Sequence, residues 1–499
     1  STPIKSSAAS DVYKRQVKIQ VLIIGGKSMS VKHKEVFGIN ESLAKEILDV
    51  ALSTGGDFAE VFIENTRNDS IEMRLDKISK VNISKVTGAA LRIIKGNTEV
   101  NCSLTAYSKE ELLVAAKTLA DSFSGTKHKE VEPFVEKNVE LVVHPLRVRG
   151  NNLNEEIDLL SKANKGAKDY SDEVVQVVST IAKKEQEIFV FASDSTWQTD
   201  YRCNNRIATQ VVGNDGTSMQ PGFGSFGRNQ GMEMYDGFDA YAFGKNVAKD
   251  TIEMLHADEM QGGEMPVVIH NGFGGVILHE ACVHGLEATS VAKGMSVFCG
   301  KIGTKVASDI VNAVDDGTNL NAWGSINVDD EGTPSKCNVL IENGILKTYL
   351  VDKRNSRKMN HPITGSSRRE SYKYQTTSRM TNTYFLNGKS TFEEIIQNTK
   401  YGLFAKEMGG GSVNPATGEF NFAVNVAYMI EDGKITKPVK GATLVGSGKD
   451  VLLRIDMIGN NLSCGYGMCG SESGSIPTIV GQPTIRVSHM TVGGKGGNN

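Results

Sequence analysis

The sequence contains no apolar stretch long enough to cross a membrane as a helix. Apolar runs such as Val267–Ile269 are far shorter than the ~20 residues that a spanning helix needs, so no membrane partner is expected. An excess of either charge is also absent, because 55 basic and 58 acidic residues leave a formal net charge of -3. Such a balance provides no electrostatic attraction to nucleic acid, and no direct nucleic-acid partner is expected.

Proline and paired cysteines are scarce as well. Only 11 prolines stand against 52 glycines, which excludes a Pro-rich disordered chain and predicts many tight turns. The seven cysteines are odd in number and scattered, which indicates a reducing compartment, and a cytoplasmic location is expected. Residues 1–28 contain no methionine and no signal-peptide pattern. We therefore expect the native chain to start at Met29 and residues 1–36 to be a disordered or artefactual leader.

At 499 residues the chain exceeds a single hydrophobic core, and its patterns predict three structural units. Residues 37–125 are predicted to form an N-terminal α+β domain. Helical spacing covers Glu41–Leu52 and Lys109–Phe123, and the alternation between Phe58 and Leu104 predicts four or five antiparallel strands. The helices are expected to lie against one face of this sheet.

Residues 126–262 are predicted to form a middle α+β region. It has helical spacing at Asn154–Tyr170 and Ala240–Leu255, strands within Glu173–Gln210, and a glycine-rich loop at Gly222–Gly231. From residue 263 to 499, turn signals separate short strands, and after Ile302 only Thr391–Thr399 has helical spacing. The predicted fold class is α+β: an N-terminal α/β layer domain followed by a β-rich catalytic domain, built as an antiparallel sheet or barrel, with one embedded helix.

That embedded helix carries His279, Glu280 and His284. Imidazole is a common zinc ligand, and a carboxylate beside a ligand can take a proton from an attacking water. In a regular helix, however, residues i and i+5 lie roughly 140° apart. A π-type bulge would bring the two rings to one face. The alternative is that one histidine packs in the core and the other caps a chain end.

A catalytic zinc ion needs a third protein ligand. The C-terminal segment offers Cys469 among flexible glycines, and Cys464 and Cys282 are competing candidates. The residues alone do not choose among these thiols, because an isolated cysteine is more often a small buried apolar residue than a ligand.

The segment Leu278–Glu287 resembles the HExxxH helix of the TldD/PmbA metalloproteases, in particular the TldD branch, which retains the metal site. The resemblance runs from about Glu35 to the C-terminus and is strongest after Gly263. One departure is Cys282-Val283, where members often carry Val-Gly. Further segments that resemble the family are 314–318, 329–334, 365–372, 379–383, 437–443, 481–483 and 491–494.

This resemblance implies a zinc-dependent metallopeptidase with His279, His284 and Cys469 as ligands, one Zn²⁺ per active subunit and Glu280 as general base. It also implies a homodimer, or a heterodimer with a TldE/PmbA-type paralogue that lacks the zinc site, and short or unfolded peptides as substrates. An extended peptide could add to an exposed sheet edge in the β-rich domain.

Arg379, Tyr372 and backbone N–H groups near Gly470 are candidates for contacting the substrate and its oxyanion. The charged segments nearby have less specific interpretations. Asp329–Glu331 is interpreted as a solvated turn, and Arg368–Glu370 as an ion-paired strand face.

Two functions compete with peptide hydrolysis. The family has carried the label of a DNA gyrase modulator, so a non-enzymatic regulatory protein is one alternative. The intact set of His279, Glu280, His284 and Cys469 argues against it. Another metallohydrolase, such as an amidase, is the second alternative, because chemistry at zinc does not specify the acyl group.

Overall fold

The computed structural model describes residues 35–143, 148–414 and 416–494. The predicted leader lies outside these residues except for Glu35 and Val36, and so does Met29. Within the described ranges, no helix has the length and apolar character needed to span a membrane.

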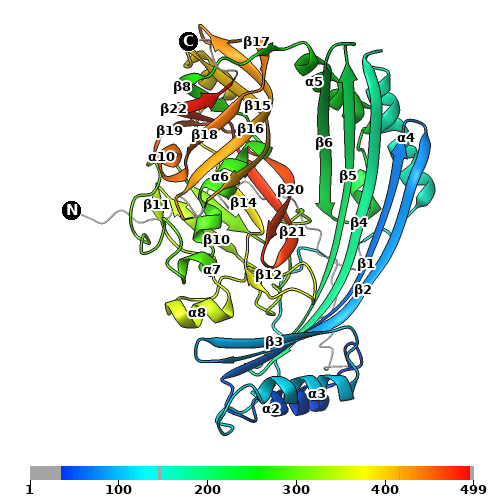
Figure 1. The fold of residues 1–499 in the computed structure, drawn as a ribbon, viewed down its shortest axis with the longest axis vertical. Helices are drawn as coiled ribbons and strands as arrows, with labels where there is room; N and C mark the ends of the chain where they lie inside the picture. The colour runs from blue at the N-terminus through cyan, green and yellow to red at the C-terminus, as the bar shows by residue number, and fades with distance from the viewer. Residues whose placement is uncertain (1–34, 144–147, 415, 495–499) are drawn as a thin grey trace, which may run out of the picture.

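A long, twisted six-stranded antiparallel sheet forms the N-terminal half (Figure 1). Its central strand β1 pairs with β2 from Phe58↔Ile94 to Arg74↔Lys77, and with β4 from Glu60↔Ala192 onward. Only three strands, longer than predicted, fill residues 58–104. The order is β3 (Thr98–Leu104), β2 (Lys77–Lys95), β1 (Phe58–Arg74), β4 (Val174–Ala192), β5 (Trp197–Asn214) and β6 (Met219–Asn229). Strands from the predicted units 37–125 and 126–262 share this sheet. The division into units at residues 125 and 262 stays a prediction.

Four helices cover one face of this sheet. Helices α2 (Glu41–Ala51) and α3 (Lys109–Ala120) pack on the half near Ala59, Val61 and Ile63. Side-chain caps start both helices: Asn40 accepts from Leu43 N, and Ser108 with Glu111 forms a capping box. Helices α4 (Leu153–Lys168) and α5 (Ala240–Leu255) cover the other half of the same face. The predicted helix positions are confirmed to within a few residues.

The glycine-rich segment 222–231 is a strand through most of its length, so the predicted loop was wrong. Strand β6 occupies it as the edge of the sheet. A Cβ atom at Gly222 would lie 1.8 Å from Thr251 Oγ1, and one at Gly224 would lie 2.5 Å from a Val247 methyl group. The glycines therefore allow α5 to lie directly on the strand, a reason for glycine that a turn-based interpretation overlooks.

A closed five-stranded barrel forms the C-terminal part of the molecule. The strands pair in the cycle β15, β8, β22, β18, β16 and back to β15. Their bounds are β8 Gly263–Ile269, β15 Tyr401–Val413, β16 Glu419–Glu431, β18 Thr443–Ser447 and β22 Ile485–Gly493. Short strands β7 (Asp258–Glu259), β17 (Lys434–Lys440) and β19 (Ile455–Ile458) extend it. The predicted α+β class with a barrel-like C-terminal domain is confirmed.

A second six-stranded sheet packs beside the barrel. Strand β14 runs parallel to β21, with Thr383 paired to Val480, and the hairpin β20–β21 ends the sheet, so that β20 is an edge strand. The order is β11 (Ile345–Leu346), β10 (Cys337–Glu342), β9 (Ala313–Asp316), β14 (Asn382–Phe385), β21 (Gly474–Gln482) and β20 (Ser463–Ser471). Strands β12 (Ser367–Arg368) and β13 (Thr377–Ser378) form a separate pair.

Short helices complete the C-terminal half. The predicted helix at Thr391–Thr399 is confirmed as α9 (Phe392–Gln397), with a capping box formed by Thr391 and Glu394. Two further helices, α8 (Lys353–Met359) and α10 (Gly448–Leu453), were not predicted, because segments of six or seven residues show little periodicity. The remaining helical segments are α6 (Val276–Ala281), α7 (Ala288–Val291) and the 3₁₀ turns Met232–Tyr235, Phe273–Gly275 and Val283–Leu286.

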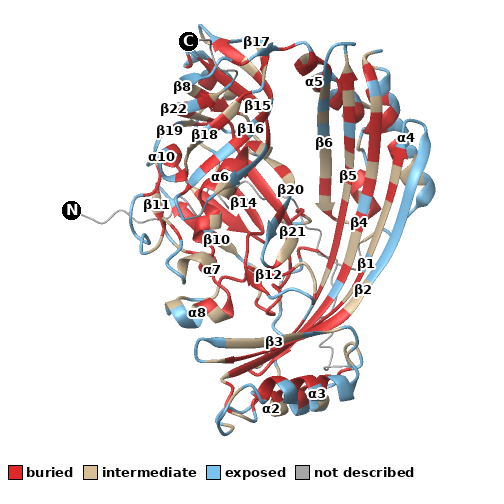
Figure 2. Cartoon of the chain, viewed as in Figure 1, coloured by how far each residue is buried: buried red, intermediate tan, exposed pale blue. Residues whose placement is uncertain are grey.

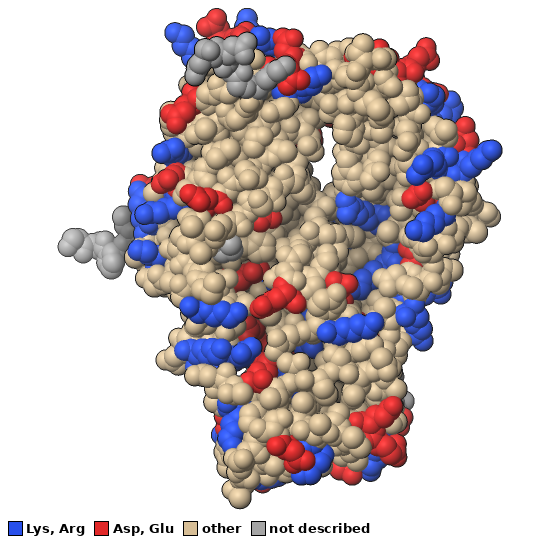
Figure 3. Space-filling view, viewed as in Figure 1, with Lys and Arg blue, Asp and Glu red and all other residues tan. Residues whose placement is uncertain are grey.

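The two halves enclose an opening. Figure 3 shows the molecule hollowed between the barrel side and the strands β4–β6. Burial differs along the long sheet: residues 58–64 of β1 and 88–94 of β2 are buried, whereas residues 77–85 of β2 are exposed (Figure 2). On one side the opening is bounded by the long sheet, and on the other by the region that carries the edge strand β20 (Figure 1).

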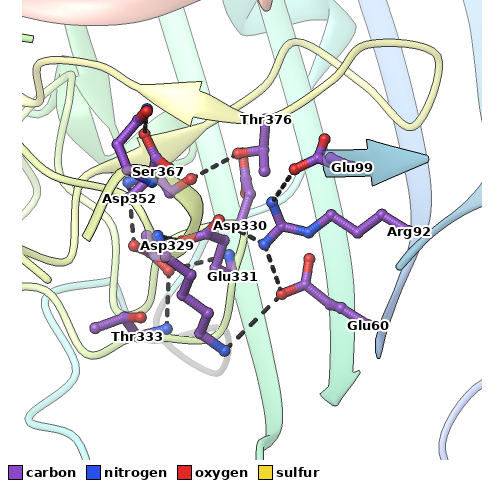
Figure 4. Close-up of polar contacts among 12 residues, drawn as sticks. Glu60, Arg92, Glu99, Asp329, Asp330, Glu331, Thr333, Asp352, Ser367 and Thr376 are labelled. Carbon is purple, nitrogen blue, oxygen red and sulfur yellow. Dashed lines mark hydrogen bonds and ion pairs between the residues drawn. The ribbon is translucent and has the colours of Figure 1, made fainter. Parts of the chain in front are cut away.

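A buried ionic network joins the long sheet to the C-terminal half (Figure 4). Arg92 on β2 pairs with Glu60 at 3.1 Å, with Glu99 at 3.6 Å and with Glu331. On β5, Arg202 pairs with Asp330 at 2.8 Å. The interpretation of Asp329–Glu331 as a solvated turn was wrong, since all three residues are buried. Arg92 and Arg202 from the sheet pair with Glu331 and Asp330, and Asp329 accepts hydrogen bonds from backbone N–H groups of Glu331, Thr333 and Ser367. These partners allow the carboxylates to be buried.

Candidate metal centre

A break in the chain after α6 brings the two motif histidines together. The helix ends at Ala281, and Cys282 adopts φ -128°, ψ -61° before the 3₁₀ turn that contains His284. The imidazole centroids of His279 and His284 lie 4.9 Å apart at 86°. The predicted π-type bulge was wrong: a non-helical residue between two short helical segments turns the second ring toward the first.

Cys469 on β20 completes a group of three potential ligands. Its Sγ lies 3.3 Å from His279 Nε2 and 3.3 Å from His284 Nε2, and the candidate ligand atoms all lie within 4.8 Å of one another. The other two candidate thiols are elsewhere. Cys282 is fully buried in the barrel-side core. Cys464 packs with Ala322, Trp323, Ile479 and Tyr466 on the opposite face of β20.

The donor set and spacing fit a zinc ion. Zinc bonds of about 2.0–2.3 Å in tetrahedral geometry separate two ligand atoms by roughly 3.5 Å, close to the two 3.3 Å contacts of Cys469. Three protein ligands leave the fourth position for water or substrate, as in catalytic zinc sites. The residues present could therefore hold a metal ion of this type.

Electrostatics within the group favour a thiolate. Burial alone would raise the pKa of the Cys469 thiol, but His279 and His284 beside it lower the pKa to about 4. For the His284 imidazole, burial alone would lower the pKa, but the negative charges of Glu287 and Cys469 raise this pKa well above its ordinary value. The thiolate is the form of cysteine that binds metals.

Glu280 lies at the more exposed side of this group. Its Oε2 is 3.7 Å from His284 Nε2, and its side chain is 22 % exposed against 13 % for His284. A carboxylate in this position can exchange a proton with a water molecule next to the three ligand atoms.

Two further residues, Glu287 and Arg379, lie behind the group. Glu287 Oε2 is 3.2 Å from His284 Nδ1, and Glu287 Oε1 is 3.8 Å from Arg379 Nε. No role was predicted for Glu287 from the sequence; its position three residues after His284, within one turn, was the available signal. Arg379 was predicted to contact substrate, but it is fully buried and donates to the carbonyl oxygen of Cys469 at 2.6 Å. It supports the strand from behind, because its side chain enters the core.

Of the other two residues predicted to contact substrate, Tyr372 lies far from the three candidate ligands and Gly470 lies next to Cys469. Tyr372 packs against Phe62 and Val190 in the long sheet, so the structure does not bring it to the histidines. Gly470 follows Cys469 on the edge strand, is exposed, and has open space where a Cβ atom would be. Arg368, on strand β12, and Arg369 are both buried: Arg368 donates to the carbonyl oxygens of Met380 and Pro477, and Arg369 lies 3.6 Å from a Glu60 carboxylate oxygen.

Comparisons with known proteins agree with this architecture. Residues 59–122, 148–255 and 262–494 match domain 1, the central domain and the C-terminal domain of the PmbA/TldA metallopeptidases. A metalloprotease TldD homolog of Haemophilus influenzae is 35 % identical over 90 % of this chain and 95 % of its own length.

Two other comparisons extend the match. A zinc metalloprotease TldD homolog of Saccharolobus solfataricus is 29 % identical over 52 % of this chain and 58 % of its own length. The crystal structure of TldE from Thermococcus kodakarensis has the same fold, with a TM-score of 0.71 and 18 % identity over 88 % of this chain and 97 % of that one. The chain belongs to the PmbA/TldD family of metallopeptidases.

Proposed function

We propose that the protein is a zinc-dependent peptidase that cleaves short or unfolded peptides, with one zinc ion held by His279, His284 and Cys469. The observation that carries this proposal is the convergence of three ligand atoms within 4.8 Å from segments about 190 residues apart in sequence. Zinc in such a site supplies Lewis-acid polarisation of a carbonyl group and lowers the pKa of a bound water. The name of the Saccharolobus relative supports zinc as the metal.

Glu280 is the proposed general base and, later, the general acid. Its carboxylate would take the proton from the attacking water and pass it to the leaving amine. The side chain is placed for this exchange because it lies beside His284 but keeps partial solvent exposure. Backbone N–H groups near Gly470 remain the candidates for oxyanion support; Arg379 is excluded by its burial.

The edge strand β20 is the proposed binding site for the substrate backbone. It pairs on one side with β21, and within the described residues no strand pairs with the other edge of residues 465–471. A peptide added there would form main-chain hydrogen bonds next to Cys469 with little selection for side chains. Extended chains fit such an edge, whereas folded proteins do not.

The proposal extends to the assembly and the location of the protein. We propose a dimer, either of this chain or with a TldE-type partner; the TldE structure supports the second form through its shared fold. The seven cysteines, all free, support a reducing, cytoplasmic setting.

A digest of an unfolded polypeptide, with and without a chelator, tests the proposal. We expect cleavage that the chelator abolishes and that added zinc restores. Cleavage that persists after complete metal removal would contradict the proposal. Zinc-dependent hydrolysis of small amides without peptide cleavage would instead support an amidase, and metal binding without turnover would support a regulatory protein.

A further inference from the structure

One carboxylate behind the three ligand candidates has no role in the chemistry described so far. Glu287 is 5 % exposed, and its Oε2 lies 3.2 Å from Nδ1 of His284, on the side of the ring away from Cys469. His279 has no equivalent partner: its Nδ1 is buried without a hydrogen bond in the part of the chain that the structure describes. The two histidines are thus supported differently.

The contact with Glu287 determines which nitrogen of His284 can bind a cation. An ionised carboxylate only accepts hydrogen bonds, so the proton of a neutral His284 ring lies on Nδ1. Nε2 then presents its lone pair toward Cys469 Sγ, 3.3 Å away. Carboxylates that hold a ligand histidine in this way also fix the orientation of the ring.

Arg379 connects this carboxylate to the strand that carries the thiol. Its Nε lies 3.8 Å from Glu287 Oε1, and both atoms are buried without a hydrogen-bond partner among the described residues. Its other nitrogens donate to Cys469 O at 2.6 Å, Ser473 Oγ at 2.6 Å and Gly474 O at 3.0 Å. One guanidinium therefore contacts the β20–β21 hairpin and faces the carboxylate that contacts His284.

We infer that Glu287, held by Arg379, is a positioning residue for the metal site. It keeps His284 in the tautomer with a free Nε2, and it fixes the position of the turn that carries His284 relative to Cys469. This inference rests on the proposed metal site. Removal of partners of this kind typically lowers metal affinity 10–100-fold.

Competition with a chromophoric chelator tests the inference through zinc affinity rather than activity. Glu287→Met keeps the side-chain length but removes the acceptor, and Glu287→Gln keeps an acceptor oxygen for His284 Nδ1. We expect a 10–100-fold loss of zinc affinity for Glu287→Met and recovery to within a few fold for Glu287→Gln. Glu264→Met is the matched control, because Glu264 also pairs with a histidine, His489 at 2.7 Å, at an exposed position.

Cobalt-loaded protein supplies a readout that a purely structural role would not change. The visible absorption of cobalt reports ligand geometry, and we expect the Glu287→Met spectrum to change and the Glu287→Gln spectrum to resemble wild type. Thermal unfolding of the metal-free variants establishes that they fold. Wild-type affinity and spectrum in folded Glu287→Met, or equal losses in Glu287→Met and Glu287→Gln, would overturn the inference. A wild-type protein that binds no zinc would overturn the proposed function itself.

Discussion

At the scale of single residues, the candidate site depends on the chain turn at Cys282. The i, i+5 spacing of the histidines would separate two rings on a regular helix, yet the rings lie 4.9 Å apart. The residue types alone thus indicated candidate metal ligands, although their spacing on a regular helix argued against a shared site. The geometry itself depends on a non-helical φ, ψ pair at one residue, which no residue preference indicates.

Replacement of Glu280 tests its proposed role in proton transfer. Glu280→Gln keeps the size of the side chain but removes the base, so we expect kcat to fall ~10²–10⁴-fold with zinc content unchanged. Steady-state kinetics on a fluorogenic peptide and elemental analysis would measure both quantities. Glu342→Gln, in an exposed pair with Lys347, is the control. Near-normal turnover by Glu280→Gln would remove Glu280 from the mechanism.

At the residue level, side-chain chemistry indicated which residues are candidate ligands, whereas the predictions that depended on burial were wrong. Histidine and cysteine were possible ligands by type, and residue chemistry alone left three thiols open. The family resemblance implied Cys469, and strand β20 places Cys469 on the histidine side and Cys464 on the other. Arg379 has the right chemistry for substrate contact, yet it is fully buried. Side-chain type does not report burial when the covering elements are distant in sequence.

At the scale of elements, helix boundaries were predictable because capping residues and apolar spacing are local. Strand β6 was not, because its glycines accommodate α5, an element that begins eleven residues later. The barrel closes through pairs such as β8–β15 and β8–β22, which join segments more than 100 residues apart. Pairing at that distance leaves no local pattern in the sequence.

Substrate addition to β20 predicts a dependence on main-chain amides. N-methylation of alternate amides on one edge of a peptide removes hydrogen bonds to a neighbouring strand. We expect a peptide methylated on the edge that faces β20 to bind at least tenfold more weakly to the Glu280→Gln protein, measured by fluorescence anisotropy. The same peptide methylated on its opposite edge is the control. Equal affinities for the two peptides would contradict strand addition.

The start of the barrel side supplies a pH-dependent prediction. His270, just after β8, packs against Phe392 and Phe404 and contacts Thr484. Burial, reinforced by the positive charge of Lys406, lowers its pKa to about 4. Because an unfolded histidine titrates near 6.5, the stabilisation exists above pH 6.5 and is lost as the pH falls through 6.5 toward 4.

His270→Gln removes this titration while keeping a polar group near Thr484. We expect the free energy of unfolding of the variant to vary less between pH 6.5 and 4, by roughly 1–3 kcal/mol, than that of the wild type. Urea unfolding at several pH values would measure it, with the exposed His256→Gln as control. Identical pH dependence in wild type and His270→Gln would exclude His270 as the cause.

At the scale of the whole molecule, the ionic network fixes the long sheet against the C-terminal half. Arg92 is buried among Glu60, Glu99 and Glu331 and stacks beside Phe58 at 5.7 Å. The sequence suggested a solvated acidic turn, because the three carboxylates are adjacent while the cations that pair with Glu331 and Asp330 lie on β2 and β5. This ionic contact between the two halves could therefore not be predicted from the sequence.

Replacement of Arg92 tests how much the ionic network contributes to the stability of the fold. Arg92→Met would leave three buried carboxylates without their shared cation, and we expect it to destabilise the protein by roughly 3–5 kcal/mol in urea unfolding. Arg67→Met is the control, since Arg67 forms an exposed pair with Asp69 and its loss should cost less than about 1 kcal/mol. Equal effects of the two changes would show that the network does not stabilise the fold.

Elemental analysis of the purified protein tests the central claim most directly. If His279, His284 and Cys469 hold the metal, wild type and Cys464→Ala should each contain about one zinc ion per chain, and Cys469→Ala should lose most of it. Zinc retained at full stoichiometry by Cys469→Ala, or absent from zinc-supplied wild type, would contradict the account.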